Sequence, residues 1–181
     1  MKKWIAAFCF MFLGTANASL ITETHDITAA GENSIGFTYF KVITAGVFDL
    51  YTTGPTIDPV LILFHDDGNL DLSDLITGDD DSCPDSLCGV AGDYSNALIA
   101  NLFLNTGSYV AVISNFDFSP SEAVSGSNTN DLTGLASINI VRSPNDSTGA
   151  TAVLTTSVPE PSTLLLFGMS VLGFAGMRRR A

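Results

Sequence analysis

The chain has 181 residues, a formal net charge of −12, 46% hydrophobic residues and only 14% charged residues. This acidic balance excludes most nucleic-acid-binding proteins, because phosphate groups attract a basic surface. The apolar content excludes a wholly disordered chain, and the length fits one ordinary domain with accessory segments.

The charges are unevenly distributed along the chain. Basic residues gather in Lys2-Lys3 and in Arg178 to Arg180, and only Lys41 and Arg142 lie between these groups. All acidic residues except Glu160 fall in the middle part. We therefore expect targeting segments on both sides of an acidic folded domain, residues 19–142, which is followed by a Ser/Thr-rich last strand and linker, residues 143–157.

Residues 1–18 have the three parts of a signal peptide in the right order. Lys2 and Lys3 form a positive segment, Trp4 to Leu13 is an apolar run, and Ala16 and Ala18 form a small-x-small cleavage site. The alternative is the buried N-terminal helix of a cytosolic protein, which does not require this order. The pattern predicts export, with cleavage after Ala18.

A second apolar run, residues 163–177, carries no charge and precedes the arginine cluster Arg178, Arg179 and Arg180. It is slightly shorter than the roughly 20 residues of an ordinary transmembrane helix. The arginines are expected to stay on the cytoplasmic side of the membrane. A C-terminal helix of the core is the alternative, but the arginines have no acidic partner nearby. We predict a transmembrane helix.

The pentapeptide Val158-Pro159-Glu160-Pro161-Ser162 stands directly before this run. Its two prolines hold the backbone extended and prevent helix hydrogen bonds there. Followed by an apolar helix and arginines, it resembles the PEP-CTERM sorting signal over residues 158–181. The resemblance implies processing by an exosortase, a membrane enzyme of Gram-negative bacteria that make exopolysaccharide. It also implies anchoring in the inner membrane before processing, and then a place at the cell surface or outside the cell.

The middle of the chain has the short apolar and alternating runs of an all-β protein, separated by Gly, Asn and Asp turns. We predict a two-sheet antiparallel sandwich or jelly roll. Thr44-Ala45-Gly46 is expected to be a hairpin turn, and residues 60–64 a strand buried on both faces. The expected strands are residues 34–43, 47–52, 60–64, 97–104, 108–114, 136–141 and 151–155.

Residues 35–141 also resemble the bacterial pre-peptidase C-terminal-like β-sandwich. The resemblance rests on the run FKVITAGVFDLYTTGPTIDPVLILF from Phe40 to Phe64, on His65-Asp66-Asp67-Gly68-Asn69, and on LFLNTGSYVAVIS from Leu102 to Ser114. The loop from Thr77 to Asp93 departs from this family, since it is longer and holds cysteines. The family implies an extracellular accessory module that sometimes binds calcium and has no catalysis of its own.

Two cysteines, Cys83 and Cys88, remain after removal of the signal peptide. In an oxidising compartment this close pair predicts a disulfide, which would stabilise the chain by about 2 kcal/mol. Half of a zinc site is the alternative, but no further cysteine or nearby histidine supports it.

Aspartates crowd the segment that follows the predicted buried strand. Calcium prefers six to eight oxygen ligands on flexible loops, and grouped carboxylates repel one another unless a cation neutralises them. The EF-hand pattern is missing, and a solvated acidic loop is the alternative. The preferred calcium ligands are Asp66, Asp79, Asp80 and Asp81.

The sequence has no pattern typical of catalysis. Its only histidines are His25 and His65, and it lacks the motifs of a serine-hydrolase elbow, a zinc protease or a phosphate loop. A pair of carboxylates could serve a glycosidase, but no apolar pocket is evident. We predict a non-enzymatic structural or adhesive protein of the cell surface or the exopolysaccharide matrix. The alternative is a calcium- or carbohydrate-binding module.

Overall fold

The computed structural model describes residues 21–54, 56–89 and 96–155. The predicted signal peptide with Ala16 and Ala18, the predicted transmembrane helix and the proline-rich pentapeptide all lie outside these residues. No helix in the described ranges is long and apolar enough to cross a membrane. The elements are β1 Ile21–Ile27, β2 Gly36–Thr44, β3 Gly46–Thr53, β4 Pro59–His65, η1 Leu72–Asp74, β5 Leu75–Asp79, α1 Asp85–Cys88, β6 Leu98–Leu104, β7 Gly107–Asn115, α2 Pro120–Ser125, β8 Gly134–Arg142 and β9 Thr151–Leu154.

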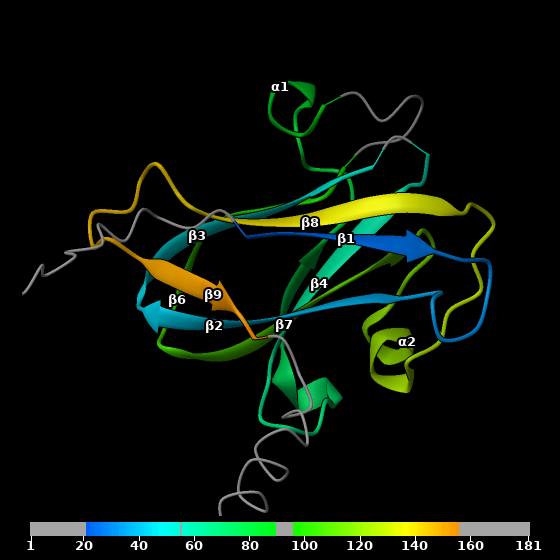
Figure 1. Ribbon diagram of the computed structural model, residues 1–181, viewed down its shortest axis with the longest axis horizontal. Helices are drawn as coiled ribbons and strands as arrows, with labels where there is room; N and C mark the ends of the chain where they lie inside the picture. The colour runs from blue at the N-terminus through cyan, green and yellow to red at the C-terminus, as the bar shows by residue number, and fades with distance from the viewer. Residues whose placement is uncertain (1–20, 55, 90–95, 156–181) are drawn as a thin grey trace, which may run out of the picture.

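The strands form two antiparallel sheets, as predicted. One sheet has the order β1-β8-β3-β6 and the other the order β5-β4-β7-β2-β9 (Figure 1). The pairs β1·β8, β2·β7, β3·β6 and β4·β5 are those obtained by folding one long antiparallel ribbon over itself. This pairing is that of a jelly roll, to which β9 adds a further strand beside β2.

The prediction of a hairpin at Thr44-Ala45-Gly46 is wrong. β2 lies in the five-stranded sheet and β3 in the four-stranded sheet, so this turn crosses from one sheet to the other. A hairpin is impossible because both edges of β2 are occupied, one by β7 and the other by β9. Asp146 supports the crossing, since its Oδ1 atom accepts the N–H of Val47 at 3.0 Å.

All seven expected strands are present, with ends that differ by at most two residues from those predicted. The sequence reasoning missed β1 and β5. β1 alternates, but Glu23 and His25 occupy its half-buried positions between Ile21 and Ile27, so the apolar signal is weak. β5 is a short edge strand without a fully buried residue.

The main core lies between the sheets and takes one face of each strand. Phe48 and Leu50 of β3 face Phe40 and Val42 of β2 within the same apolar cluster. The Phe40 ring stacks on Tyr109 with 5.5 Å between ring centroids. Because Tyr109 donates its hydroxyl hydrogen to the Asn105 carbonyl at 2.9 Å, its one polar atom is satisfied at the rim of the core.

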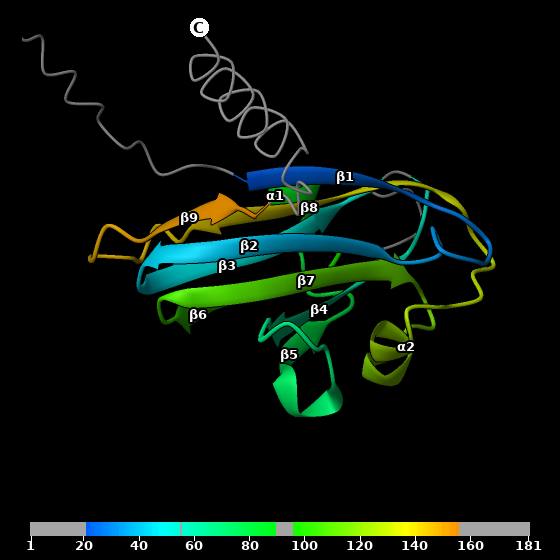
Figure 2. The same ribbon diagram turned by 60° about the horizontal axis from the view of Figure 1, so that its bottom comes forward.

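A second apolar cluster covers the outer face of the five-stranded sheet. Val60, Ile62 and Phe64 of β4 point outward and pack with Ala123 of α2, whereas Leu61 and Leu63 point into the main core. Figure 2 shows α2 and η1 on the side of the molecule away from β1 and β8. The prediction that β4 is buried on both faces is confirmed.

Two sets of hydrogen bonds hold α2 in place. The side chain of Ser119 accepts the N–H of Glu122 at the start of the helix, and the Glu122 carboxylate accepts the N–H of Ser119 in return. After the helix, the buried Asn128 amide donates to Ser114 Oγ at 3.0 Å and to the Asn115 carbonyl at 3.3 Å. These contacts fix residues 116–119 beside the start of β4.

Candidate functional site

Three strand ends meet at one edge of the five-stranded sheet. β4 begins there, while its antiparallel neighbours β5 and β7 end there. The N–H of Asp58 donates to Asn115 Oδ1 at 3.0 Å, and the N–H of Phe116 donates to the Asp58 carbonyl at 2.8 Å. The pairing therefore brings Asp58, which precedes β4, close to the aspartates that end and follow β5.

Asp58, Asp80 and Asp81 form a cluster of carboxylates at this edge. One oxygen of each lies within 4.8 Å of the others. The Oδ1 atoms of Asp58 and Asp80 are buried, and within the part of the chain that the structure describes they have no hydrogen-bond partner. A buried carboxylate oxygen without a donor carries an uncompensated desolvation cost. Two buried oxygens of the cluster therefore lack, among the described residues, the hydrogen bonds that would offset their desolvation.

The charges around Asp80 add to that cost. Burial is the largest cause that raises the pKa of Asp80 to about 6, and the negative charges of Asp81, Asp58, Asp79 and Asp117 contribute the rest of this shift. Burial also raises the pKa of Asp58, with a smaller contribution from Asp81. All the charges acting on these two groups are negative, so a bound cation would relieve both the repulsion and the missing contacts.

The donor set suits a hard cation. Three carboxylates supply oxygen atoms of the kind that calcium prefers, and backbone carbonyls or water would complete six to eight ligands. Nitrogen or sulfur ligands, which zinc and copper favour, do not belong to the cluster.

The structure brings together only part of the predicted calcium site. Asp80 and Asp81 are in the cluster. Asp79 points elsewhere, since its Oδ2 atom accepts the N–H of Leu98 at 2.7 Å and that of Ser82 at 3.0 Å. Asp66 follows the opposite end of β4, where its Oδ1 atom accepts the N–H of Gly68. Of the four predicted ligands, the cluster therefore contains Asp80 and Asp81, and it contains Asp58 in addition.

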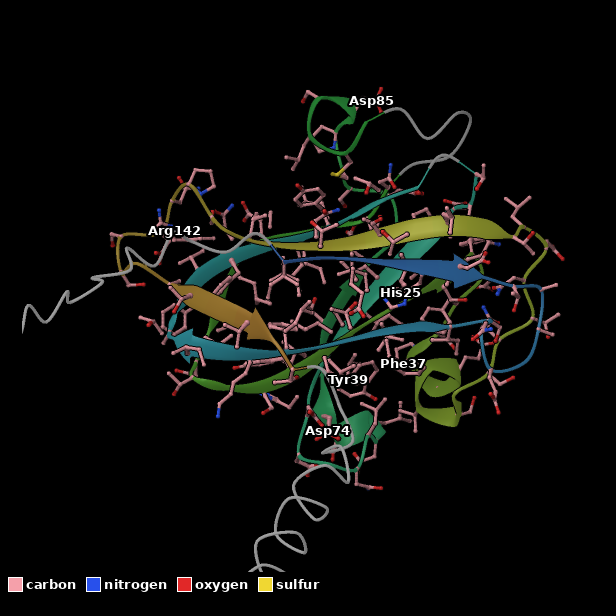
Figure 3. The ribbon with its side chains drawn as sticks, in the orientation of Figure 1. His25, Phe37, Tyr39, Asp74, Asp85 and Arg142 are labelled. Atoms are coloured by element: carbon pink, nitrogen blue, oxygen red, sulfur yellow. A yellow bond between two sulfur atoms is a disulfide. The ribbon has the colours of Figure 1, made fainter. Side chains whose placement is uncertain are left out.

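The wider run of aspartates is dispersed over the surface. Asp74 belongs to η1 and Asp85 to α1, which lie at opposite sides of the molecule (Figure 3). Asp71 and Asp74 cap η1 reciprocally, so their proximity in sequence has a local structural use. The sequence reasoning missed Asp58 because it lies outside the run of aspartates. The pairing of β4 with β5, a strand that was also missed, brings Asp58 beside Asp80 and Asp81.

An apolar groove of about 390 Å³ adjoins the carboxylate cluster. Its walls come from the outer face of β4, from β5 and from the segment that leads into α2. Asp80 lines the groove and also belongs to the cluster. The lining residues are Val60, Ile62, Leu75, Gly78, Asp79, Asp80, Phe116, Asp117, Phe118 and Pro120.

Cys83 and Cys88 form a disulfide, as predicted, with 6.1 Å between their Cα atoms. The bond encloses α1, and the backbone of Cys83 pairs with that of Asn96 next to β6. The disulfide and this pairing restrain the chain just after Asp79, Asp80 and Asp81. Because both thiols are consumed, they are not free to bind zinc.

The two histidines lie in different parts of the sandwich. His25 Nε2 lies 2.9 Å from Thr38 Oγ1 between β1 and β2, and burial lowers its pKa despite the opposing charge of Glu23. Figure 3 shows His25 between these strands. The His65 ring packs on Tyr109 with 5.1 Å between ring centroids. Both have structural contacts, and the absence of catalysis stays a prediction.

The raised pKa of Asp80 gives a testable pH dependence. Its folded-state pKa is about 6 against an ordinary value of 3.8, so the folded protein binds the proton more tightly. The stabilising effect of protonation is complete below 3.8 and is lost as pH rises through about 6.

In metal-free buffer, we therefore expect the free energy of unfolding of the wild type, relative to Asp80→Asn, to increase as pH falls from about 7 to about 4. Urea titrations at several pH values measure this difference. The contribution of His25 is common to both proteins and cancels. Parallel pH curves for the two proteins would show that Asp80 titrates normally.

Comparison with known proteins locates a match outside the sandwich. Residues 157–180 match the family model described as the PEP-CTERM protein-sorting motif. No curated protein shows significant similarity to the chain. The resemblance of residues 35–141 to the pre-peptidase C-terminal-like domain is not confirmed and stays a prediction. The predicted sorting signal is confirmed: the chain carries a PEP-CTERM sorting motif, which marks it as an exported substrate of an exosortase.

Proposed function

We propose that the protein is an exported structural or adhesive component of the cell surface or the extracellular polysaccharide matrix. The observation that carries this proposal is the sorting motif at residues 157–180. An exosortase would recognise the Pro-Glu-Pro segment, cleave the chain near it and release the acidic sandwich from its membrane anchor. The released domain would then act by its surface, as a binding or packing unit, without catalysis.

The position of the motif relative to the fold supports this order of events. β9 ends at Leu154, and the N–H of Thr155 still donates to the Tyr39 carbonyl at 2.9 Å. The matched motif begins at residue 157. Cleavage within Pro159 to Ser162 would therefore leave every strand of the described sandwich intact. A disulfide between Cys83 and Cys88 also suits a protein that works outside the cytoplasm.

Replacing Pro159, Glu160 and Pro161 together by alanine tests the sorting step. We expect the variant to accumulate in the membrane fraction with Arg178 to Arg180 still attached, because the extended recognition segment is lost. Fractionation of the producing cells with mass spectrometry of C-terminal peptides measures this. Pro144→Ala, an exposed proline in the loop before β9, is the matched control and should be processed normally. Normal processing of the triple variant would contradict the proposal.

A second candidate function is calcium binding by the sandwich. It is favoured by a group of three carboxylates in which two buried oxygens, of Asp58 and Asp80, have no hydrogen-bond partner in the described part of the chain. Asp58, Asp80 and Asp81 would hold the ion, which would cross-link the ends of β4 and β5. Because the ion competes with a proton on Asp80, calcium binding should weaken as pH falls through about 6.

Thermal unfolding with and without calcium tests this function. The wild type, first stripped of metal, should gain about 2.7 kcal/mol of stability when free calcium is 100-fold above its dissociation constant. Asp58→Asn and Asp80→Asn should lose most of that gain. Asp66→Asn should keep it, since Asp66 lies at the other end of β4. An equal gain in all four proteins, or none in the wild type, would contradict a site at this cluster.

A further inference from the structure

The apolar groove beside α2 has the size of a binding site for a small molecule or for a short part of a polymer. Its volume of about 390 Å³ falls within the usual range for ligand pockets, roughly 300–1,000 Å³. Val60 and Ile62 of β4 belong to its lining, and Leu75 of β5, which is 40% exposed, stands at its edge. The groove is therefore lined mostly by apolar residues, together with the carboxylates of Asp79, Asp80 and Asp117.

An exposed aromatic residue, Phe116, belongs to the lining of the groove. Phe116 is 52% exposed, whereas its neighbour Phe118 is buried in the apolar cluster beneath α2. The Phe116 backbone is fixed by its N–H bond to the Asp58 carbonyl. An aromatic side chain on a fixed backbone offers a large flat apolar surface and has only two side-chain torsions to order on binding.

The carboxylates that line the groove are hydrogen-bond acceptors. Asp117 is exposed, and Asp79 and Asp80 also line the groove. Ionised carboxylates accept hydrogen bonds and donate none, so a matching ligand must bring its own donors. The negative charge also disfavours phosphate-, sulfate- or uronate-rich polymers.

We propose that this groove binds one or two sugar rings of a neutral polysaccharide. A pyranose ring has an apolar C–H face, which would lie on Phe116, and hydroxyl groups at its edge, which would donate to the exposed carboxylate of Asp117. A neutral sugar therefore complements both parts of the groove: its apolar face matches the aromatic ring, and its hydroxyl groups supply the hydrogen-bond donors that the carboxylates require. The inference rests on the proposed function in one respect, that an exported protein meets polysaccharide outside the cell.

A basic apolar peptide is the competing ligand class, because it would also complement the carboxylates. The two classes differ in what they require of the site. A peptide cation would be attracted by the whole acidic edge and would weaken strongly with salt, whereas a neutral sugar depends on the Phe116 ring and is nearly insensitive to salt. Salt dependence therefore separates the two classes in one experiment.

The test uses the full-length protein, purified in a detergent without a sugar headgroup. Neutral hexasaccharides of glucose, mannose, galactose and xylose are screened by saturation-transfer NMR, in calcium and in EDTA. A basic apolar decapeptide and an oligo-uronate are included as competitors. Phe116→Ala is compared with Phe103→Ala, which removes a ring of similar exposure, 55%, from β6 in the other sheet. Asp117→Asn tests the carboxylate contact.

We expect at least one neutral hexasaccharide to bind in one of the two buffers, with an affinity that changes little between low and high salt. Phe116→Ala should weaken binding by about tenfold or more, as truncation of an aromatic anchor does, and Asp117→Asn should weaken it less. Phe103→Ala should bind as the wild type does. Far-ultraviolet circular dichroism and the thermal midpoint verify that each variant is folded.

The proposal is overturned if no neutral hexasaccharide binds in either buffer, or if Phe116→Ala and Phe103→Ala bind equally. It is also overturned if only the peptide or the oligo-uronate binds. These outcomes leave the sorting function untouched, because processing is measured on the C-terminal peptides of the Pro159 to Pro161 variant. Conversely, normal processing of that variant would refute the sorting step without affecting binding by the purified protein.

Discussion

The burial of β4 on both faces is the constraint on which the rest of the structure depends. Leu61 and Leu63 belong to the core between the sheets, while Ile62 and Phe64 lie under α2. β4 is also hydrogen-bonded on both edges, to β5 and to β7. Since all its neighbours are antiparallel, the start of β4 must lie beside the ends of two other strands. The carboxylate cluster and the groove both form at that edge.

The sorting motif and the sandwich have different roles in the molecule. The motif at residues 157–180 implies export and membrane anchoring before processing, and it begins just after the last described strand. The sandwich determines what the delivered protein can contact. At its acidic edge, two carboxylate oxygens that have no hydrogen-bond partner among the described residues lie beside an apolar groove, and Asp80 belongs to both features. Binding of a cation and binding of a ligand in the groove are therefore expected to be coupled.

The sequence was sufficient for the strands whose apolar signal is strong and local. β4 and β7 were found because continuous apolar runs suit strands in the middle of a sheet. β1 was missed because Glu23 and His25 interrupt its apolar face, and His25 is accommodated only through its contact with Thr38 on another strand. The crossing at Ala45 was mistaken for a hairpin because a turn sequence does not tell which sheet receives the next strand.

In the candidate site, too, the sequence predicts residues that are neighbours along the chain but not those that strand pairing brings together. Asp80 and Asp81 were found by their density in the sequence. Asp58 is more than twenty residues away, and only the pairing of β4 with β5 brings it to them. Asp66 and Asp79 looked equivalent to Asp80 in the sequence, but turn and backbone contacts already occupy their oxygens. Whether a carboxylate oxygen is available to bind a ligand depends on tertiary hydrogen bonds, and the amino-acid composition does not reveal these.

The intact mass of the protein recovered from its producing cells and from their medium tests the central claim most directly. Export followed by exosortase processing predicts a chain that starts at Ser19 and ends within Pro159 to Ser162, with the Cys83–Cys88 disulfide intact. A mass that still includes Arg178 to Arg180 in every fraction would contradict processing at the motif. The sandwich would then work as a permanently anchored domain at the membrane surface.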